Sequence, residues 1–448
     1  MTTLTRRQAL MTGGAALLLP AGLRAATSPP AEVDVAVIGA GLAGLSAARL
    51  LAERNRSVAI LEARERVGGR IRAETLAPGI HADLGAAMLR SADINPFVAE
   101  LRRREVRLQA DDGDYWLFDG SRDADTEDYD ALGFCYDKLD DALLDARTLR
   151  SDVTLASRVK VDGKWADTAR ALAGPLHVGI DYNAVSALDA PRLSGTGNDA
   201  WISGGFAAWV AQYAAGLPVY LGRPVVRIDW SGDHVTIATA EGELRAEVCI
   251  VTVPVGLLNA REGINFQPAL PQPQREALGR ISMGVLDRVA LHYEPGSFEA
   301  PANTQALPRI SGTRGMSFRL NAQGMPLAVA TLGGEHAREL EAQGDAAMVN
   351  AARLQLKAMF GDALDKRFIR GVASNWGRDP WSRGSVATVR PGFATARRNA
   401  GRALTSPSGR ARVLFAGEAF APTDWIGSAT GAWLSGKQAA AEALRLFG

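Results

Sequence analysis

The pattern of hydrophobic residues near the start of the chain predicts two buried strands joined by a helix. Val33–Ile38 is an unbroken aliphatic run, which is typical of a strand buried on both faces. Leu45–Arg54 repeats apolar residues at helical spacing, and Ser57–Leu61 is a second short apolar run that ends at Glu62. This order indicates a βαβ unit with parallel strands, and hence an α/β fold.

The spacing of apolar residues predicts further helices and strands along the chain. Helical spacing recurs over Asp137–Leu149 and Trp165–Ala173. Leu286–Tyr293 alternates apolar and polar residues, which predicts a half-exposed strand, and strands are also expected at Leu327–Leu332 and Phe368–Asn375.

Length and charge narrow the class of protein. A chain of 448 residues exceeds the size of one ordinary core, so two successive or intertwined domains are expected. The chain has 50 basic and 49 acidic residues, and a nucleic-acid-binding protein would normally carry a basic excess. We therefore expect no nucleic-acid partner.

The cysteines do not indicate a metal site. Cys135 and Cys249 are far apart, and no CxxC or Cys/His cluster accompanies them, so we expect no metal. Cys249 lies in an apolar run, where a small buried hydrophobic role is expected. Whether the two form a disulfide is left open.

The first 27 residues have the composition of an export signal. Arg6 and Arg7 precede an apolar stretch that is too short to cross a bilayer, and small residues follow it. The paired arginines resemble a twin-arginine signal, which would make the mature protein periplasmic or secreted with no stable membrane span. An ordinary secretory signal or a disordered start remains the alternative.

The turn after the first strand has the spacing of a dinucleotide site. Gly39 permits the tight turn, Gly41 lets the backbone approach a pyrophosphate, and Gly44 lets helix and strand pack closely. The helix start, which includes Ala43, offers free N–H groups to phosphates. Glu62, about twenty positions later, is placed to accept hydrogen bonds from a ribose.

The residues after Glu62 point to FAD. The segment that contains Arg64, Gly69 and Arg70 resembles the corresponding segment of the flavin-containing amine oxidase superfamily, which includes monoamine and polyamine oxidases, histone lysine demethylases and L-amino-acid oxidases. Arg64 and Arg70 are expected to supply cations near the phosphates. The resemblance extends to six further segments: Asp83–Met88, Ile202–Phe206, Val225–Ile228, Val251–Pro254, Leu414–Glu418 and Gly431–Gly436.

This resemblance implies a fold and a cofactor. The fold class would be α/β, with a Rossmann-like FAD-binding domain and an interleaved α+β substrate domain. The FAD-binding domain would comprise residues 31–90, 195–270 and 405–448, and the substrate domain residues 91–194 and 271–404. FAD would be bound non-covalently, and the further residues expected around it are Ala87, Met88, Val225, Glu418, Ser428 and Ala429.

The resemblance also implies a reaction. An amine would lose a hydride from the carbon beside its nitrogen to flavin N5, and O2 or another electron acceptor would reoxidise the flavin. The family's lysine near N5 is replaced here by Arg288. Arginine is bulkier, planar and permanently charged, so weak reactivity with O2 is one expectation and a solvent-facing position is the alternative.

The substrate side departs from the family in other ways. Val386 stands where an aromatic residue of the amine cage is usual, and Ser428 stands at the second cage position. Trp381 and Trp425 are candidate replacement rings, although each has plain packing as its alternative. Ser385 occupies the place of a flavin-bonded cysteine, which excludes that covalent link.

Arg90 is a candidate for binding a substrate carboxylate. L-amino-acid oxidases place such an arginine at the position of Met88, two residues earlier, although a surface arginine is the simpler interpretation. Because the cage is altered, two alternatives to amine oxidation stay open: desaturation of an apolar substrate, and a flavin-binding interaction protein with little turnover. The small-molecule substrate and the oligomeric state are not identified by the sequence.

Overall fold

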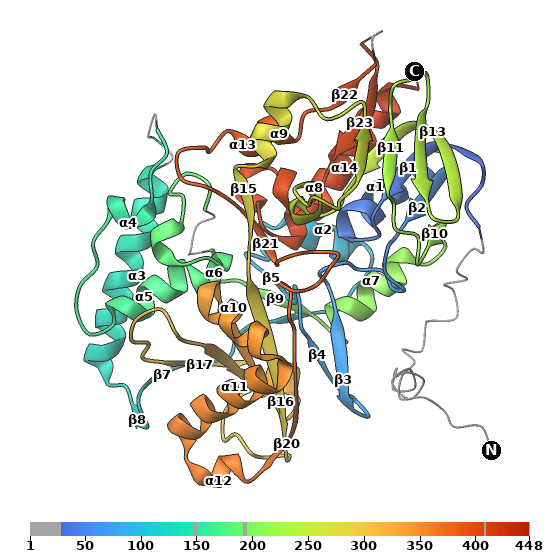
Figure 1. The fold of residues 1–448 in the computed structure, drawn as a ribbon. Coiled ribbons are helices and arrows are strands. Elements are labelled where there is room, and N and C mark those ends of the chain that lie inside the picture. The colour runs from blue at the N-terminus through green and yellow to red at the C-terminus, as the bar shows by residue number, and fades with distance from the viewer. Residues whose placement is uncertain (1–27, 147, 149–150, 191–194, 407–408, 448) are drawn as a thin grey trace, which may run out of the picture.

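The computed structural model describes residues 28–146, 148, 151–190, 195–406 and 409–447. The predicted export signal, residues 1–27, lies outside this part of the chain. Two large sheets, each with its own helices, make up the molecule, and shorter strand pairs lie between them (Figure 1). The family-type α/β architecture expected from the sequence is confirmed.

The first large sheet has nine strands and contains the predicted βαβ unit. β1 pairs in parallel with β2 on one side and with β13 on the other, and β23 extends the sheet beside the end of β13. The strands are β1 (Glu32–Ile38), β2 (Val58–Leu61), β10 (Val219–Tyr220), β11 (Arg227–Asp229), β12 (Val235–Thr239), β13 (Gly242–Val251), β14 (Asn265–Gln267), β22 (Leu404–Thr405) and β23 (Ala411–Phe415). The predicted first strands are thus confirmed to within a residue or two.

Helices from distant parts of the chain cover this sheet. They are α1 (Leu42–Ala52), α2 (Pro96–Arg103), α7 (Phe206–Ala214) and α14 (Ala429–Arg445). The ring of Phe97 in α2 lies 5.4 Å from that of Trp209 in α7 and 5.3 Å from that of Trp433 in α14, measured between ring centres. One aromatic core therefore joins three separated segments.

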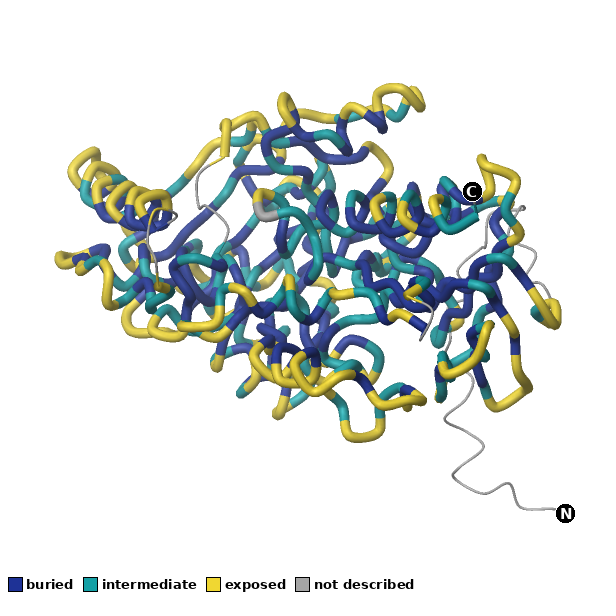
Figure 2. The backbone as a smooth tube through the Cα atoms, turned by 90° about the horizontal axis from the view of Figure 1, so that it is seen from above, coloured by how far each residue is buried: buried dark blue, intermediate teal, exposed yellow. Residues whose placement is uncertain are grey.

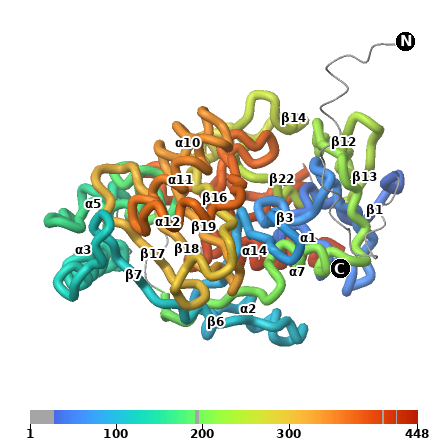
Figure 3. The backbone as a smooth tube through the Cα atoms, turned by 90° about the horizontal axis from the view of Figure 1, so that it is seen from below, coloured from blue at the N-terminus to red at the C-terminus, as the bar shows by residue number. Residues whose placement is uncertain are grey.

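The second large sheet has seven strands. They are β7 (Tyr115–Asp119), β8 (Arg122–Asp123), β16 (Leu286–Tyr293), β17 (Thr304–Pro308), β18 (Ser317–Leu320), β19 (Leu327–Gly333) and β20 (Phe368–Ala373). Residues of α10 (Gly334–Gln343), α11 (Asp345–Phe360) and α12 (Asp362–Asp365) share a buried apolar cluster with it. A second cluster joins it to α3 (Thr126–Ala146), α4 (Leu155–Arg158), α5 (Ala166–Ala173) and α6 (Pro175–Val178). In Figure 3, α3 and α5 lie beside β7 and β17.

Shorter elements connect the two sheets. β5 (Met88–Leu89) and β6 (Leu108–Ala110) flank β9 (Ala200–Ile202), while β15 (Ile281–Gly284) pairs with β21 (Val386–Val389) and β3 (Ala73–Ala77) with β4 (Ile80–Asp83). Short helices α8 (Val255–Leu258), α9 (Gln272–Leu278) and α13 (Ala396–Ala400) complete the set. The chain passes repeatedly between the two sheets, and its buried backbone forms a continuous interior in Figure 2. The domain boundaries remain predictions.

Two sequence predictions are wrong in detail. β16 is not half-exposed, because it lies between β19 and β20 and its residues from Val289 to Tyr293 are all buried. α3 begins at Thr126 rather than near Asp137, since the Asp125 carboxylate accepts a 3.0 Å hydrogen bond from the Asp128 N–H at the helix start.

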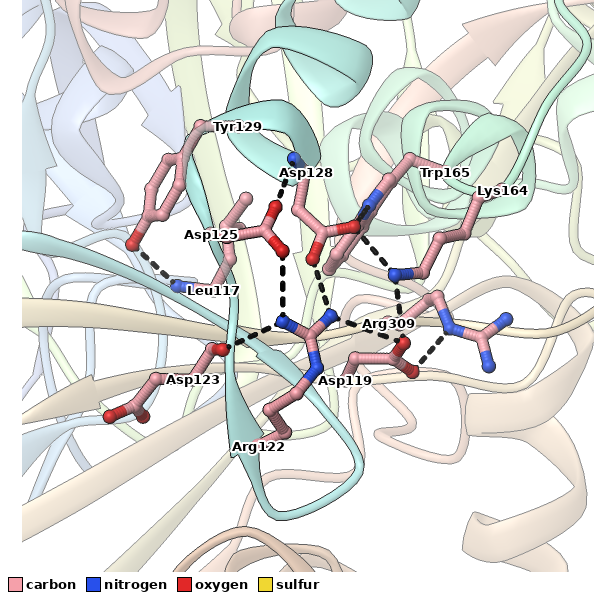
Figure 4. Close-up of polar contacts among 10 residues, drawn as sticks. All are labelled: Leu117, Asp119, Arg122, Asp123, Asp125, Asp128, Tyr129, Lys164, Trp165 and Arg309. Atoms are coloured by element: carbon pink, nitrogen blue, oxygen red, sulfur yellow. Dashed lines mark hydrogen bonds and ion pairs between the residues drawn. The ribbon is translucent and has the colours of Figure 1, made fainter.

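A cluster of charged side chains ties the β7–β8 hairpin to α3 and to the segment before α5 (Figure 4). The buried Asp128 carboxylate accepts hydrogen bonds from Lys164 Nζ at 2.6 Å, Trp165 Nε1 at 2.8 Å and Arg122 Nη2 at 2.5 Å. The Lys164 ammonium is the main cause that lowers the pKa of Asp128 below its usual range, and the same cation lowers that of Asp119 to about 2.

This cluster predicts a pH-dependent loss of stability when Asp128 is replaced by asparagine. Because the folded state favours the ionised carboxyl, its contribution is present above the unfolded pKa of about 3.9 and is lost as pH falls towards the lower folded value. Asp128→Asn is expected to lower the melting temperature at pH 7, with a smaller difference at pH 3. The exposed Asp123→Asn serves as the control, and an equal effect of both variants at pH 7 would contradict the prediction.

Candidate functional site

A cavity of about 920 Å³ lies at the carboxyl ends of β1 and β13 and extends to β16. In α/β sheets of this kind, ligands bind beyond the carboxyl ends of the parallel strands. Every predicted site residue except Gly44 lines this cavity: Gly39, Gly41, Ala43, Glu62, Arg64, Gly69, Arg70, Ala87, Met88, Arg90, Val225, Arg288, Trp381, Val386, Glu418, Trp425, Ser428 and Ala429.

The glycine turn is fixed from behind by Thr252, which follows β13. Thr252 Oγ1 donates to Ile38 O at 2.8 Å and to Gly39 O at 3.3 Å, so the turn is held against the sheet. Gly39 has a φ of +105°, which side chains rarely adopt. A Cβ on Gly44 would lie 2.0 Å from Gly39 O, whereas a Cβ on Gly41 would meet no protein atom within 4 Å. Gly44 therefore serves helix packing, and Gly41 faces the cavity.

Glu62 closes the turn with both of its carboxylate oxygens. Oε2 accepts from Ala40 N at 2.7 Å and Oε1 from Arg64 N at 2.9 Å, and the side chain is buried at the end of β2. Each carboxylate oxygen can accept a second hydrogen bond. The carboxylate is thus held in place with capacity left for two hydroxyl groups.

The two predicted phosphate-side arginines are each paired with a carboxylate. Arg64 Nη2 lies 2.6 Å from Asp379 Oδ1, and Arg70 Nη1 lies 2.7 Å from Glu418 Oε1. Arg70 also donates to Ser385 O at 2.7 Å. These pairs link the turn after β2 to distant segments near residues 380 and 418. Because each arginine already has a carboxylate partner, it is less available to a phosphate than the sequence suggested.

Glu418 holds several parts of the cavity wall together. Its Oε1 accepts from Arg70 and from Ala387 N at 3.1 Å, while its buried Oε2 has no hydrogen-bond partner among the described residues. A buried polar atom without a partner is unfavourable unless a ligand supplies one. Glu418 is therefore placed to accept a hydroxyl of a molecule in the cavity.

A second helix also presents its start to the cavity. α14 begins at Ala429, as predicted, and Ser428 Oγ accepts from Gly431 N at 3.0 Å. Ala429 and Thr430 line the cavity, whereas no side chain caps the start of α1. Helix starts carry free N–H groups and partial positive charge, which favour anionic groups.

These features fit FAD. The uncapped start of α1 and the open space at Gly41 suit a pyrophosphate, Glu62 suits a ribose, and the free Oε2 of Glu418 suits a further hydroxyl. The start of α14 suits the electron-rich edge of a flavin ring. Ser385 accepts from Leu286 N and donates to Gly284 O at 3.1 Å, and it offers no thiol for a covalent link.

Arg288 is a cation that lines the cavity from β16. Its backbone is held in β16 by Ser374, whose Oγ accepts from Arg288 N at 2.8 Å. Within the described residues, its guanidinium makes no hydrogen bond or ion pair. Burial lowers its pKa, and the nearby carboxylate of Asp83 opposes that shift. The alternative of a solvent-facing strand position is therefore wrong, because Arg288 lines the cavity.

A buried carboxyl pair supports Arg288 from behind. Asp287 is fully buried, and its Oδ1 accepts from Ser374 Oγ at 2.7 Å and from Trp376 N at 2.9 Å. Burial first, and the neighbouring Glu341 second, raise the pKa of Asp287 well above its usual range. A second carboxylate nearby disfavours ionisation of Asp287, whose Oδ2 has no hydrogen-bond partner among the described residues.

This pair predicts that Asp287→Asn stabilises the protein at alkaline pH. A raised folded pKa means that wild-type stability is greatest below the unfolded value of about 3.9 and falls as pH rises towards the folded value. Asparagine stays neutral and is expected to stabilise the fold by about 1–3 kcal/mol at pH 8 with little effect at pH 4. Denaturant unfolding at both pH values checks this, with exposed Asp130→Asn as the control. Equal stabilisation by Asp287→Asn at pH 4 and at pH 8 would contradict this prediction.

The residues at the two altered positions of the amine cage lie close to one another in the cavity wall. Val386 Cγ1 is close to Gly427, where an added Cβ would lie 3.1 Å from it, and Ser428 follows directly. Trp381 and Trp425 both line the cavity and are half-buried. The structure thus brings the two tryptophans to the cavity that Val386 also lines, although their role as cage rings stays a prediction.

Several lining residues were not found from the sequence. Trp376 lines the cavity and its Nε1 donates to Leu84 O at 2.9 Å, while His177 and Thr196 come from the segments around α6 and before β9. No local motif marks them, since their position depends on long-range packing. Arg90 also lines the cavity and is half-buried, and its role towards a substrate carboxylate stays a prediction.

The described residues offer neither a metal site nor a membrane span. Among them no group of three histidine, cysteine or acidic residues could hold a metal ion, and no helix combines the length and apolarity needed to span a membrane. Both cysteines are free, and burial raises the pKa of the Cys249 thiol. Its expected role as a buried hydrophobic residue is confirmed.

Comparison with known proteins identifies the class that this fold and cavity define. Residues 120–444 match the flavin containing amine oxidoreductase family, and residues 37–104 match an NAD(P)-binding Rossmann-like domain. The chain belongs to the flavin containing amine oxidoreductase family. It is an FAD-dependent oxidoreductase of the amine oxidase type, and the desaturation alternative is not favoured.

Individual relatives agree with this assignment. Polyamine oxidase 4 of Oryza sativa subsp. japonica is 29% identical over 97% of this chain and 92% of its own length. Lysine-specific histone demethylase 1 homolog 1 of the same organism is 29% identical, and the match covers 96% of this chain but 54% of that protein. A solved structure of wild-type putrescine oxidase bound to putrescine shares the fold, with a TM-score of 0.75, 20% identity, and coverage of 93% of this chain and 100% of its own.

Proposed function

We propose that the chain oxidises the C–N bond of a small-molecule amine at the Arg288 end of the cavity. The observation that carries this proposal is the continuity of the cavity, which joins the glycine turn and Glu62 to Arg288, Trp376 and Val386. FAD held by the glycine turn, Glu62 and Glu418 would supply the hydride acceptor for the carbon beside the substrate nitrogen. The names of the similar polyamine oxidases support an amine as the substrate.

The chain's own residues supply binding, orientation and electrostatics. Leu286, Val386 and Ile426 give the reacting end apolar walls that exclude water. As long as no anion pairs with it, Arg288 disfavours a second positive charge nearby and thereby lowers the pKa of a substrate ammonium. A neutral amine has the lone pair that hydride loss from the neighbouring carbon requires, so Arg288 favours the reactive form.

The test is anaerobic mixing of the FAD-loaded protein with panels of monoamines, polyamines and amino acids. Loss of the oxidised flavin absorbance with at least one amine is the expected result. An oxidised flavin after every amine would contradict amine oxidation and favour a flavin-binding protein with little turnover. Reduction by an apolar alkane-type substrate alone would favour desaturation.

The electron acceptor is proposed to be O2 used slowly, or another periplasmic oxidant. Arginine at position 288 is bulkier than lysine, planar and permanently charged, so it would present a different group to O2 even where it holds a water. After anaerobic reduction and rapid mixing with O2, we expect Arg288→Lys to be reoxidised faster than wild type. An unchanged rate would place the control of O2 reactivity elsewhere.

We also propose that residues 1–27 direct export of the folded, FAD-loaded protein by a twin-arginine pathway. The paired Arg6 and Arg7 before a short apolar stretch support this. Replacing both by lysine is expected to keep the flavoprotein in the cytoplasm after cell fractionation. Export that is unaffected by this change would contradict a twin-arginine route and favour an ordinary secretory signal.

A further inference from the structure

The cavity has a cation outside its FAD-binding features. Arg288 lines it from β16, and of the other charged lining residues Arg90 is basic and the exposed Asp424 is acidic. The other lining carboxylates lie elsewhere: Glu62 and Glu418 belong to the FAD-binding features, and Glu262 lies near Val225 and Val226. Such a wall is poorly suited to a substrate that carries several positive charges.

Arg288 lacks a protein partner where one would be expected. The nearest carboxylate that acts on it is that of Asp83, and both Asp83 oxygens accept backbone N–H groups at the start of α7, from Phe206 at 3.2 Å and Ala207 at 3.4 Å. Arg319, the other nearby guanidinium, is paired with Asp111 at 2.8 Å. Arg288 is thus a half-buried cation that lines the cavity, and its guanidinium has no acceptor among the described residues.

We propose that Arg288 binds a carboxylate of the substrate, so that the amine oxidised here is an amino acid or a similar amine with a carboxylate rather than a polyamine. This inference rests on the proposed function. A half-buried guanidinium without a partner has unused donors, and a substrate carboxylate would supply two acceptors that match its planar geometry. Arg288 therefore replaces the family lysine with a substrate-binding group.

The position of Arg288 also explains why lysine would not serve equally well. β16 fixes the backbone through Ser374 and the buried Asp287, so the guanidinium has a defined direction. Arginine presents a rigid pair of parallel donors, whereas lysine presents a single point charge. Apolar neighbours such as Met88, Leu286 and Val386 would surround the rest of such a substrate.

The test first measures binding without catalysis. Calorimetric titration of the FAD-loaded protein compares 3-phenylpropionate with its neutral amide, neither of which contains an oxidisable amine. Wild type is expected to bind the carboxylate more tightly. Arg288→Gln is expected to weaken carboxylate binding about 10- to 100-fold and to leave amide binding within about twofold. Arg288→Lys is expected to bind the carboxylate with an affinity between those of wild type and Arg288→Gln.

A matched control removes an arginine outside the cavity. Arg314 is largely exposed and paired with Glu339, and Arg314→Gln is expected to bind both probes as wild type does. Circular dichroism and retained FAD show that each variant is folded. If Arg288→Gln does not fold, two measurements still test the proposal. They are the preference of wild type for the carboxylate over the amide and the affinity of Arg288→Lys for the carboxylate. Equal affinities for the two probes in wild type, or carboxylate binding unchanged in Arg288→Lys and Arg288→Gln, would overturn the proposal.

A second arm separates this inference from the proposed function. Phenylalanine and phenethylamine differ only by the carboxylate, and anaerobic flavin reduction is expected to have a KM at least about 10-fold lower for phenylalanine, a difference that Arg288→Gln removes. Reduction by phenethylamine or polyamines with no carboxylate preference would contradict the inference alone. A carboxylate preference in binding without reduction by any amine would support the inference and contradict the proposed function.

Discussion

Replacing Gly44 by alanine is expected to abolish FAD binding and to destabilise the FAD-free protein by about 2–4 kcal/mol, because the added methyl group enters a packed core. Its Cβ would lie 2.0 Å from Gly39 O and 3.1 Å from Thr252 Oγ1. The backbone at the glycine turn cannot move without losing the hydrogen bonds from Thr252 to Ile38 and Gly39. Denaturant unfolding of the FAD-free variant and titration with FAD measure the two effects.

Gly41→Ala is the matched control because it separates cofactor binding from folding. Gly41 has a φ of −74°, which alanine adopts readily, and its Cβ would meet no protein atom within 4 Å. We expect unchanged stability without FAD and an affinity for FAD lower by about 10-fold or more, since the methyl group occupies cofactor space. Equal destabilisation by the two substitutions would contradict the distinct roles assigned to these glycines.

Glu418→Ala is expected to cause the second largest loss. The carboxylate is 7% exposed and pairs with Arg70 at 2.7 Å, and its removal leaves a partly buried guanidinium with Ser385 O as its remaining partner. Breaking such a pair from one side costs about 2–4 kcal/mol once the partial exposure of Arg70 is taken into account. FAD binding should weaken as well, because Glu418 lines the cavity with a free Oε2.

The control for this variant is a more exposed pair of the same residue types. Arg72 and Glu74 lie 2.5 Å apart, with 29% and 40% of their side chains exposed. Glu74→Ala is expected to change the free energy of unfolding by less than about 1 kcal/mol and to leave FAD binding unchanged. If the two variants unfold alike, the Arg70–Glu418 pair does not contribute the stability assigned to it.

Local patterns were sufficient to predict the dinucleotide-binding turn, and the family resemblance identified the cofactor as FAD. The strand, glycine turn, helix and Glu62 lie within about thirty residues, and backbone geometry fixes their relation once the strands are parallel. The distant Glu418 and Ala429 were found because their segments resemble those of a known family. The pairing of Arg64 with Asp379 was not predictable, since nothing in either segment indicates the other.

The substrate side depends on packing between remote segments. The direction of the Arg288 side chain follows from the position of β16 between β19 and β20, which the alternating pattern of Leu286–Tyr293 did not indicate. That pattern arises because Asp287 and His292 are polar yet buried. Trp376 and His177 reach the cavity from segments far apart in the sequence, and no spacing rule relates them.

The flavin content of the purified protein tests the central claim most directly. After reconstitution, denaturation and filtration, the account predicts one FAD per chain in the protein-free filtrate, with no flavin left on the polypeptide. Gly41→Ala should yield less FAD at the same protein concentration while keeping the stability of the FAD-free wild type. A wild-type protein that retains no FAD, or whose flavin stays attached to the denatured chain, would contradict the account.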